Sequence, residues 1–83
     1  MDDYVILNKV DNVCVALRSV SEGESIGGVI AKNHIPKGHK IAVSDIAEGE
    51  TVLKYGSPIG VALKKISPGE HVHTVNLGFQ DNL

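Results

Sequence analysis

The chain of 83 residues contains four histidines, and two of them have a spacing that suits chemistry. His71 and His73 lie two positions apart in a run that alternates polar and apolar residues, so in an extended strand their imidazoles share one face, about 7 Å apart. Such a pair can contact one metal ion or the two ends of one small ligand, but two solvated side chains on a half-exposed strand have the same spacing. A zinc or iron site takes three or more protein ligands, so any further ligands must come from elsewhere.

A second group of polar residues stands on predicted turns. His39 and Lys40 are adjacent in one turn, where together they could pair with a substrate carboxylate. Lys54 and Tyr55 come just before another turn glycine and are further candidates for ligand contacts. All of these residues can equally be solvated turn residues, and Tyr55 can equally be a packing residue. The spacing of residues indicates no catalytic triad, cysteine-histidine pair or carboxylate pair.

The element that must position these side chains is a short phrase, apolar-x-x-Gly-x-x-apolar, that occurs four times. It occupies residues 20–26, 35–41, 46–52 and 66–72. Glycine takes positive φ without a steric clash, so each phrase predicts a tight turn between two buried apolar residues. The glycines are unevenly spaced, which argues against a solenoid with a fixed period. The repeated turn instead predicts a compact all-β domain with at most one or two short helical turns.

Short strands are expected between these turns. They are residues 13–18, with Val13, Val15 and Leu17 on one side, and residues 29–31, 41–43, 51–55, 59–63 and 71–77. Gly27-Gly28 predicts a hairpin turn, Gly56-Ser57-Pro58 a second turn, and Gly60 a bulge or a close backbone approach. Ser44-Asp45-Ile46 predicts a single helical turn. Residues 78–83 are expected to be a flexible tail.

Composition bounds the class of protein. The length predicts one domain, residues 1–83, with a core of Val, Ile, Leu and Ala, because there is no Trp and only one Phe. A net charge of −2 with interspersed signs offers no basic stripe, so nucleic-acid binding is not expected. The single cysteine, Cys14, lies in an apolar run and is expected to be a buried thiol. No run is long enough to span a membrane and the N-terminus is acidic, so we expect a cytoplasmic protein.

Three motifs in order resemble the altronate/galactarate dehydratase family, in particular its small N-terminal SAF-type domain. They are Pro36-Lys37-Gly38-His39-Lys40-Ile41-Ala42, Lys54-Tyr55-Gly56-Ser57-Pro58-Ile59-Gly60 and Gly69-Glu70-His71-Val72-His73-Thr74-Val75-Asn76. The likeness extends over residues 11–76 and implies a compact β-clip fold. It also implies a lyase that removes water from a sugar acid such as altronate, with a divalent metal, Fe²⁺, that stabilises the negative charge formed when the proton next to the carboxylate is lost.

The resemblance gives roles to the residues named above. His39, His71 and His73 become catalytic candidates, His71 and His73 metal ligands, and Lys40, Lys54 and Tyr55 substrate contacts. The family tends to carry a third histidine where this chain has Val75, so the family's use of that strand face does not transfer in full.

The family's large catalytic region is absent from this sequence. The chain is therefore expected to be either a separate small subunit or the N-terminal domain of a sugar-acid dehydratase. It is expected to act with the larger catalytic subunit of the same lyase and to be inactive alone, and it can also form a homo-oligomer. Two alternatives remain at this point: the small subunit of a sulfolactate sulfo-lyase, and a non-catalytic SAF-type module for ligand binding or docking.

Overall fold

The structure is a computed structural model that describes residues 4–5 and 10–79. Within this part of the chain there are nine strands and no helix. The strands are β1 (Tyr4–Val5), β2 (Val13–Ala16), β3 (Ser25–Ile26), β4 (Val29–Ile30), β5 (Lys40–Ala42), β6 (Thr51–Lys54), β7 (Ser57–Ala62), β8 (His71–Val72) and β9 (Leu77–Gly78). The predicted all-β class is confirmed, whereas the helical turn predicted at residues 44–46 is not formed. None of the described residues belongs to a helix that could cross a membrane.

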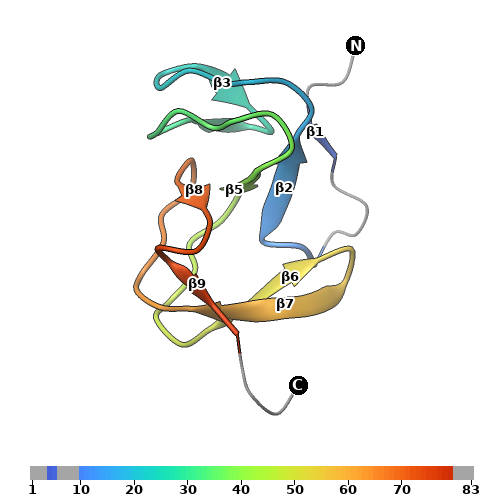
Figure 1. The fold of residues 1–83 in the computed structure, drawn as a ribbon, viewed down its shortest axis with the longest axis vertical. Helices are drawn as coiled ribbons and strands as arrows, with labels where there is room; N and C mark the ends of the chain where they lie inside the picture. The colour runs from blue at the N-terminus through green and yellow to red at the C-terminus, as the bar shows by residue number, and fades with distance from the viewer. Residues whose placement is uncertain (1–3, 6–9, 80–83) are drawn as a thin grey trace.

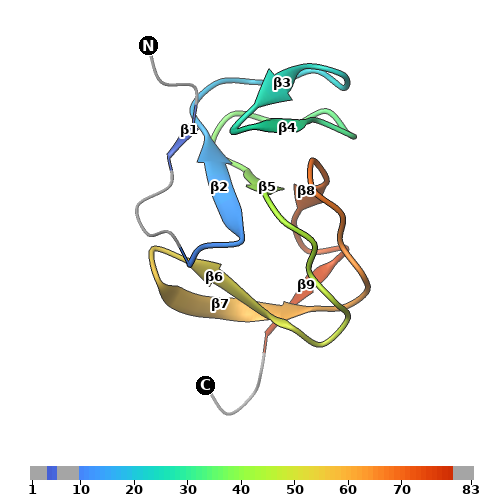
Figure 2. The same cartoon turned by 180° about the vertical axis from the view of Figure 1, so that it is seen from behind.

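The strands form three small antiparallel sheets (Figures 1 and 2). The central sheet has the order β1-β2-β5-β8, so β8 lies at its edge. The β3-β4 hairpin lies at one end of the long axis of the molecule, and the β6-β7-β9 sheet lies at the other end (Figure 1). Of the candidate residues, His39, Lys40, His71 and His73 thus lie in or next to β5 and β8 of the central sheet, whereas Lys54 and Tyr55 belong to the β6-β7 hairpin.

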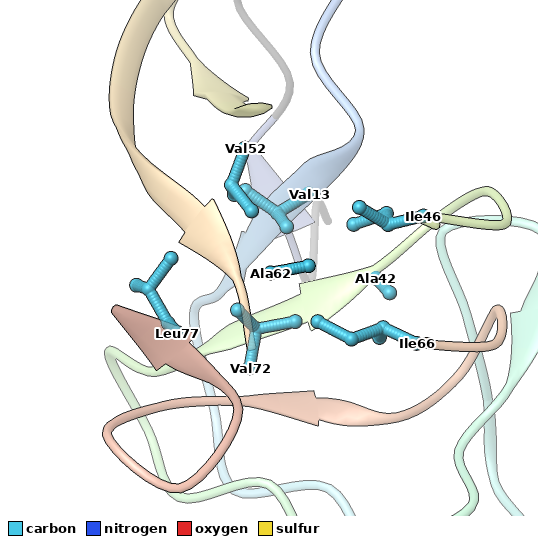
Figure 3. Close-up of a cluster of buried hydrophobic side chains, with 8 residues drawn as sticks. All are labelled: Val13, Ala42, Ile46, Val52, Ala62, Ile66, Val72 and Leu77. Atoms are coloured by element: carbon cyan, nitrogen blue, oxygen red, sulfur yellow. The ribbon is translucent and has the colours of Figure 1, made fainter. Parts of the chain in front are cut away.

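The central sheet separates two hydrophobic clusters. Because successive residues of a strand point to opposite faces, Cys14 and Ile41 enter one cluster while Val13 and Ala42 enter the other. The first cluster also contains Ala16, Val20, Ile26, Ala31 and Ile35, and the second, drawn in Figure 3, contains Ile46, Val52, Ala62, Ile66, Val72 and Leu77. Cys14 is buried, so the prediction of a buried thiol is confirmed, and burial raises the pKa of this thiol to about 11.

The four predicted turns are confirmed, and they share one set of backbone bonds. In each, the residue after the glycine donates its N–H to the carbonyl three positions earlier. The pairs are Glu24 to Ser21, His39 to Pro36, Glu50 to Ala47 and Glu70 to Ser67. The glycines, Gly23, Gly38, Gly49 and Gly69, all have positive φ. The apolar residues that precede the turns form two antiparallel β-bridges, Val20 with Ile35 and Ile46 with Ile66.

Two hairpins connect the paired turns. Gly27-Gly28 forms the turn between β3 and β4, as predicted, with φ of 61° and 82°. The β6-β7 hairpin turns at Tyr55 and Gly56, so residues 57–58, which were expected in the turn, belong to β7. Tyr55 has φ of 57°, which is unfavourable for a residue with a side chain. The Asp11 carboxylate accepts the N–H groups of Tyr55 and Gly56 at 2.8 and 2.7 Å and so stabilises this turn.

The strand predicted over residues 71–77 is wrong in its second half. Only its first two residues form β8, and the chain then turns at residues 74–76. The side chain of Asn76 hydrogen-bonds to the main chain of His71 and His73. Short amide side chains compete with sheet hydrogen bonding in this way, which explains why an alternating sequence does not continue as a strand.

Two further expectations concern strand ends. β2 ends at Ala16, two residues earlier than predicted, and Leu17 is 42% exposed instead of sharing the environment of Val13. Gly60 does mark a close approach, since a Cβ there would lie 2.2 Å from the carbonyl oxygen of Gly78. Gly78, at the start of the expected tail, is the last residue of β9, and residues 80–83 lie outside the described part of the chain.

Candidate functional site

Three imidazoles converge at the edge of the central sheet. His39 Nδ1 lies 2.9 Å from His71 Nε2, and the ring centroids of His39, His71 and His73 are 4.7 to 5.4 Å apart. One nitrogen of each ring lies within 4.8 Å of the others. His39 and His71 are half-buried, whereas His73 is exposed. The structure therefore brings together the three histidines proposed from the sequence as catalytic candidates, and the exposed His34 is not in this group.

The pairing of β5 with β8 explains this convergence. Lys40 lies opposite Val72 in the ladder, and the next position of the same antiparallel register places His39 opposite His73. Directly opposed residues share a face, and so do residues two apart on one strand. His39, His71 and His73 consequently project from one face, although 32 positions separate His39 from His71.

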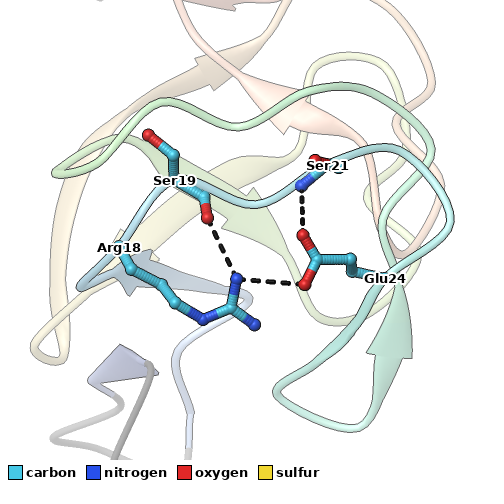
Figure 4. A network of polar contacts seen from close by, with 4 residues as sticks. All are labelled: Arg18, Ser19, Ser21 and Glu24. Carbon is cyan, nitrogen blue, oxygen red and sulfur yellow. Dashed lines mark hydrogen bonds and ion pairs between the residues drawn. The ribbon is translucent and has the colours of Figure 1, made fainter.

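His39 occupies the turn position that carries a glutamate in the other three turns. There the glutamate carboxylate accepts the N–H of the residue three positions earlier, from Ser21 to Glu24 at 2.7 Å, from Ala47 to Glu50 at 2.9 Å, and from Ser67 to Glu70. Figure 4 shows the first of these, with an ion pair of 3.1 Å between Arg18 and Glu24. Three positions before His39 stands Pro36, which has no N–H to donate. The His39 side chain therefore has no turn-closing bond to make and points to the other imidazoles instead.

Two asparagines hold the main chain that carries His71 and His73. The Asn76 side chain donates through Nδ2 to the carbonyl of His71 at 2.8 Å and accepts the N–H of His73 through Oδ1 at 2.9 Å. Asn33 Oδ1 accepts the N–H of His71 at 3.0 Å. The sequence reasoning missed both residues. The signal for Asn76 is its place just after the two histidines, since asparagine side chains often bond to nearby main chain in turns.

The environment favours the neutral form of His71. Burial lowers the pKa of His71 below its usual range, and the charges of His39, His73, Lys40 and His34 lower that pKa further. A neutral imidazole presents a lone pair that can accept a proton or bind a metal ion. The central member of the cluster is therefore in the form that both kinds of chemistry need at neutral pH.

Lys40, Lys54 and Tyr55 belong to a second group. Lys40 was expected to be displayed on a turn, and this expectation is wrong, because Lys40 is the half-buried first residue of β5. Burial lowers the pKa of Lys40, and the charge of Lys54 lowers that pKa further. The Lys54 Nζ lies 5.1 Å from the centroid of the Tyr55 ring. Strand alternation places Lys40 on the face opposite His39, so the structure groups Lys40 with Lys54 and not with its sequence neighbour.

The donor set fits a divalent transition metal. Imidazole nitrogen is a common ligand for zinc and iron, and catalytic sites keep three protein ligands with a further position open. The sequence paired His71 with His73 as metal ligands, and the structure adds His39 as the third donor on the same face. Val75, at the family's third histidine position, lies in a turn and is 74% exposed.

Comparisons with known proteins agree with the motifs. A family model described as the altronate/galactarate dehydratase SAF domain matches residues 2–80. The chain is 41% identical over 80 residues to altronate dehydratase of Bacillus subtilis and 43% identical over 77 residues to that of Escherichia coli. These alignments cover 92% and 88% of this chain but 16% of each relative, so the chain spans a small part of their length.

A relative that is named as a lyase subunit is matched over most of its length. The chain is 37% identical over 86 residues to (2R)-sulfolactate sulfo-lyase subunit alpha of Chromohalobacter salexigens. This alignment covers 90% of the chain and 92% of the relative.

Proposed function

The chain belongs to the altronate/galactarate dehydratase SAF domain family, as its motifs predicted, and from that premise we propose that it is the small subunit or N-terminal domain of a sugar-acid dehydratase. The observation that carries the proposal is the convergence of His39, His71 and His73 on one edge of the domain. An edge that presents three imidazoles is suited to complete a pocket formed mainly by another polypeptide. On the same grounds we assign the all-β fold to the β-clip class.

In this proposal His39, His71 and His73 hold a divalent ion, with Fe²⁺ as the expected metal. When bound, the ion supplies positive charge that stabilises the negative charge developing on the substrate as the proton next to its carboxylate is lost. The low pKa of His71 keeps that side chain neutral and able to bind. His73 is the exposed member, so the ring nitrogen of His73 that does not bind the ion is the candidate for donating a hydrogen bond to the leaving hydroxyl.

Lys40, Lys54 and Tyr55 are proposed to bind the substrate. The two ammonium groups lie close enough for the charge of Lys54 to lower the pKa of Lys40, so an anion between them relieves their repulsion. A sugar acid provides such an anion in its carboxylate. Tyr55 is 46% exposed, and its hydroxyl can hydrogen-bond to a sugar hydroxyl.

The proposed partner is a larger chain of the same lyase. The chain matches 16% of the length of the altronate dehydratases and 92% of the length of a protein named as a lyase subunit alpha. Both observations support a role in which this domain supplies the imidazoles and a second chain supplies most of the pocket.

A second candidate is the small subunit of a sulfolactate sulfo-lyase. The near full-length match to subunit alpha of such an enzyme favours it. The two candidates share the three-histidine site and differ in the leaving group, which is water in one and sulfite in the other.

Reconstitution tests the proposal. The chain is purified alone and together with a larger lyase chain that lacks this domain, and dehydration of a panel of sugar acids is measured with ferrous or manganous ion. We expect no turnover by the chain alone and turnover by the mixture. Sulfite release from sulfolactate by the mixture would identify the second candidate instead. Full activity of the chain alone, or inactivity of both samples on the whole panel and on sulfolactate, would contradict a subunit role.

A further inference from the structure

We infer that Asn76 is a positioning residue for the three-histidine site, and that its side chain sets the relative orientation of the imidazoles of His71 and His73. The inference rests on the proposed metal-binding function. It concerns a side chain that no part of the sequence argument placed in the site.

Asn76 acts through the histidines and not on a ligand. The residue is 3% exposed, and both polar atoms of its side chain are occupied by main-chain partners, the carbonyl of His71 and the N–H of His73. Its own N–H donates to the carbonyl of His73 at 3.0 Å. A buried amide with these bonds cannot also contact a substrate or an ion, so any effect on binding must pass through the two histidines.

The Asn76 side chain replaces the sheet ladder at the point where the ladder stops. β8 ends at Val72, so no strand pairing fixes the backbone of His73. The amide of Asn76 instead bridges the carbonyl before Val72 and the N–H after it. The rings of His71 and His73 stack with an interplanar angle of 10° and a centroid distance of 5.4 Å. Without the bridge, the N–H groups of Asn76 and Leu77 still donate to the carbonyl of His73, but the N–H of His73 loses its Asn76 partner, which lets the arrangement of the two rings vary.

The chain contains a matched control for this bridge. Asn12 donates through Nδ2 to the carbonyl of Thr51 at 3.0 Å and accepts the N–H of Leu53 through Oδ1 at 2.8 Å. Asn12 is 7% exposed, and the valine that it brackets, Val52, belongs to the same core cluster as Val72. The two bridges are thus alike in geometry and burial, and the control bridge carries no imidazole.

The experiment compares Co²⁺ binding by the wild-type chain, Asn76→Ala and Asn12→Ala, using calorimetry for the affinity and the visible absorption bands of bound Co²⁺ for the ligand geometry. Thermal unfolding of each metal-free chain is recorded in parallel. We expect Asn76→Ala to bind about tenfold more weakly and with altered bands, since residues that orient metal ligands typically contribute 10–100-fold. Asn12→Ala is expected to lose a similar amount of thermal stability and to keep the affinity and bands of the wild type. Asn76→Ser, whose hydroxyl can keep one of the two bonds, replaces Asn76→Ala if the latter does not fold.

The outcomes separate this inference from the function on which it rests. Wild-type affinity and wild-type bands in a folded Asn76 variant would overturn the inference and leave the metal site standing. Equal loss of affinity in the Asn12 and Asn76 variants would also overturn it, because the effect would then be general destabilisation. A wild-type chain that binds no Co²⁺ would overturn the metal site and the inference together.

Discussion

His39 Nδ1 and His71 Nε2 lie 2.9 Å apart across the pairing of β5 with β8. A bond between two imidazole nitrogens needs one donor and one acceptor, so a neutral pair shares a single proton between these atoms. Replacement of that proton by a metal ion turns both nitrogens into ligands, with His73 as the third. The protonation of the three histidines and the binding of a metal ion by them are therefore linked.

Removal of one member should weaken metal binding by the chain. We expect His71→Ala to lower the affinity for Co²⁺ by at least about tenfold, because the loss of a ligand costs no less than the loss of a group that orients one. Isothermal titration calorimetry measures this change. His34→Ala is the matched control, since His34 is an exposed histidine outside the group of three. Unchanged affinity in His71→Ala, or an equal loss in both variants, would contradict the three-histidine site.

The stability of the chain should fall in mild acid. The pKa of His71 is lower in the folded state than its unfolded value of about 6.5, so the unfolded state binds more protons as the pH drops through that value. The free energy of unfolding should therefore decrease as the pH falls from 7 towards the folded pKa of His71. The contribution of His71 to stability is fully present only above the unfolded pKa. Urea unfolding at a series of pH values measures this slope, and His71→Asn should flatten it. The N–H of Ser21 lowers the pKa of Glu24, and this shift acts in a more acidic window, below the ordinary value of 4.5. An equal slope in wild type and His71→Asn would show that the prediction is wrong.

The turns should differ in what their fourth residue contributes to stability. The Glu70 carboxylate accepts the N–H of Ser67, and Glu70→Ala should lower the free energy of unfolding by about 1 kcal/mol, a typical value for one hydrogen bond. His39→Ala removes no turn-closing bond, because Pro36 offers no N–H, and it removes only the contact of His39 Nδ1 with His71 Nε2. Water can replace a partner of the half-buried His71 ring, so we expect a smaller loss than in Glu70→Ala. Chemical denaturation of both variants provides the comparison. A larger loss in His39→Ala than in Glu70→Ala would assign His39 a structural role.

Two glycines with the same backbone conformation should respond differently to substitution. Gly23 and Gly69 both have φ of 93°, but a Cβ on Gly23 meets nothing within 4 Å, whereas a Cβ on Gly69 would lie 2.0 Å from the carbonyl oxygen of Ile30. Both changes to Ala carry the cost of positive φ, so their difference isolates the steric clash. We expect Gly69→Ala to be more destabilising than Gly23→Ala by roughly 1–3 kcal/mol, the usual cost of overpacking. Equal losses in urea unfolding would argue against close packing of this turn on β4.

Much of the fold follows from local rules that the sequence displays. Glycine at the third position of each repeated turn, with apolar residues on either side, predicted the turns and the short strands. The near absence of aromatic residues predicted the core of Val, Ile, Leu and Ala. Gly27-Gly28 predicted its hairpin because two consecutive residues at positive φ suit a tight reversal. These features depend on residues that are close in sequence, which is why they could be predicted.

Other features depend on contacts between distant residues. The alternation over residues 71–77 predicted a longer strand, but the side-chain bonds of Asn76 form a turn there. Asp11 supports the positive φ of Tyr55 from 44 positions away, so the hairpin turns earlier than its Gly and Pro residues suggest. The joining of His39 to the other two histidines required the register of β5 with β8, which spacing alone does not contain.

The most direct test of the three-histidine site is an anomalous difference map from crystals of the chain grown with a divalent transition metal and measured at the absorption edge of that metal. We predict one peak bound by imidazole nitrogens of His39, His71 and His73 at about 2.0–2.1 Å, the usual distance for such ligands. A map with no peak at His39, His71 and His73, from crystals grown with an excess of the metal, would contradict the three-histidine site.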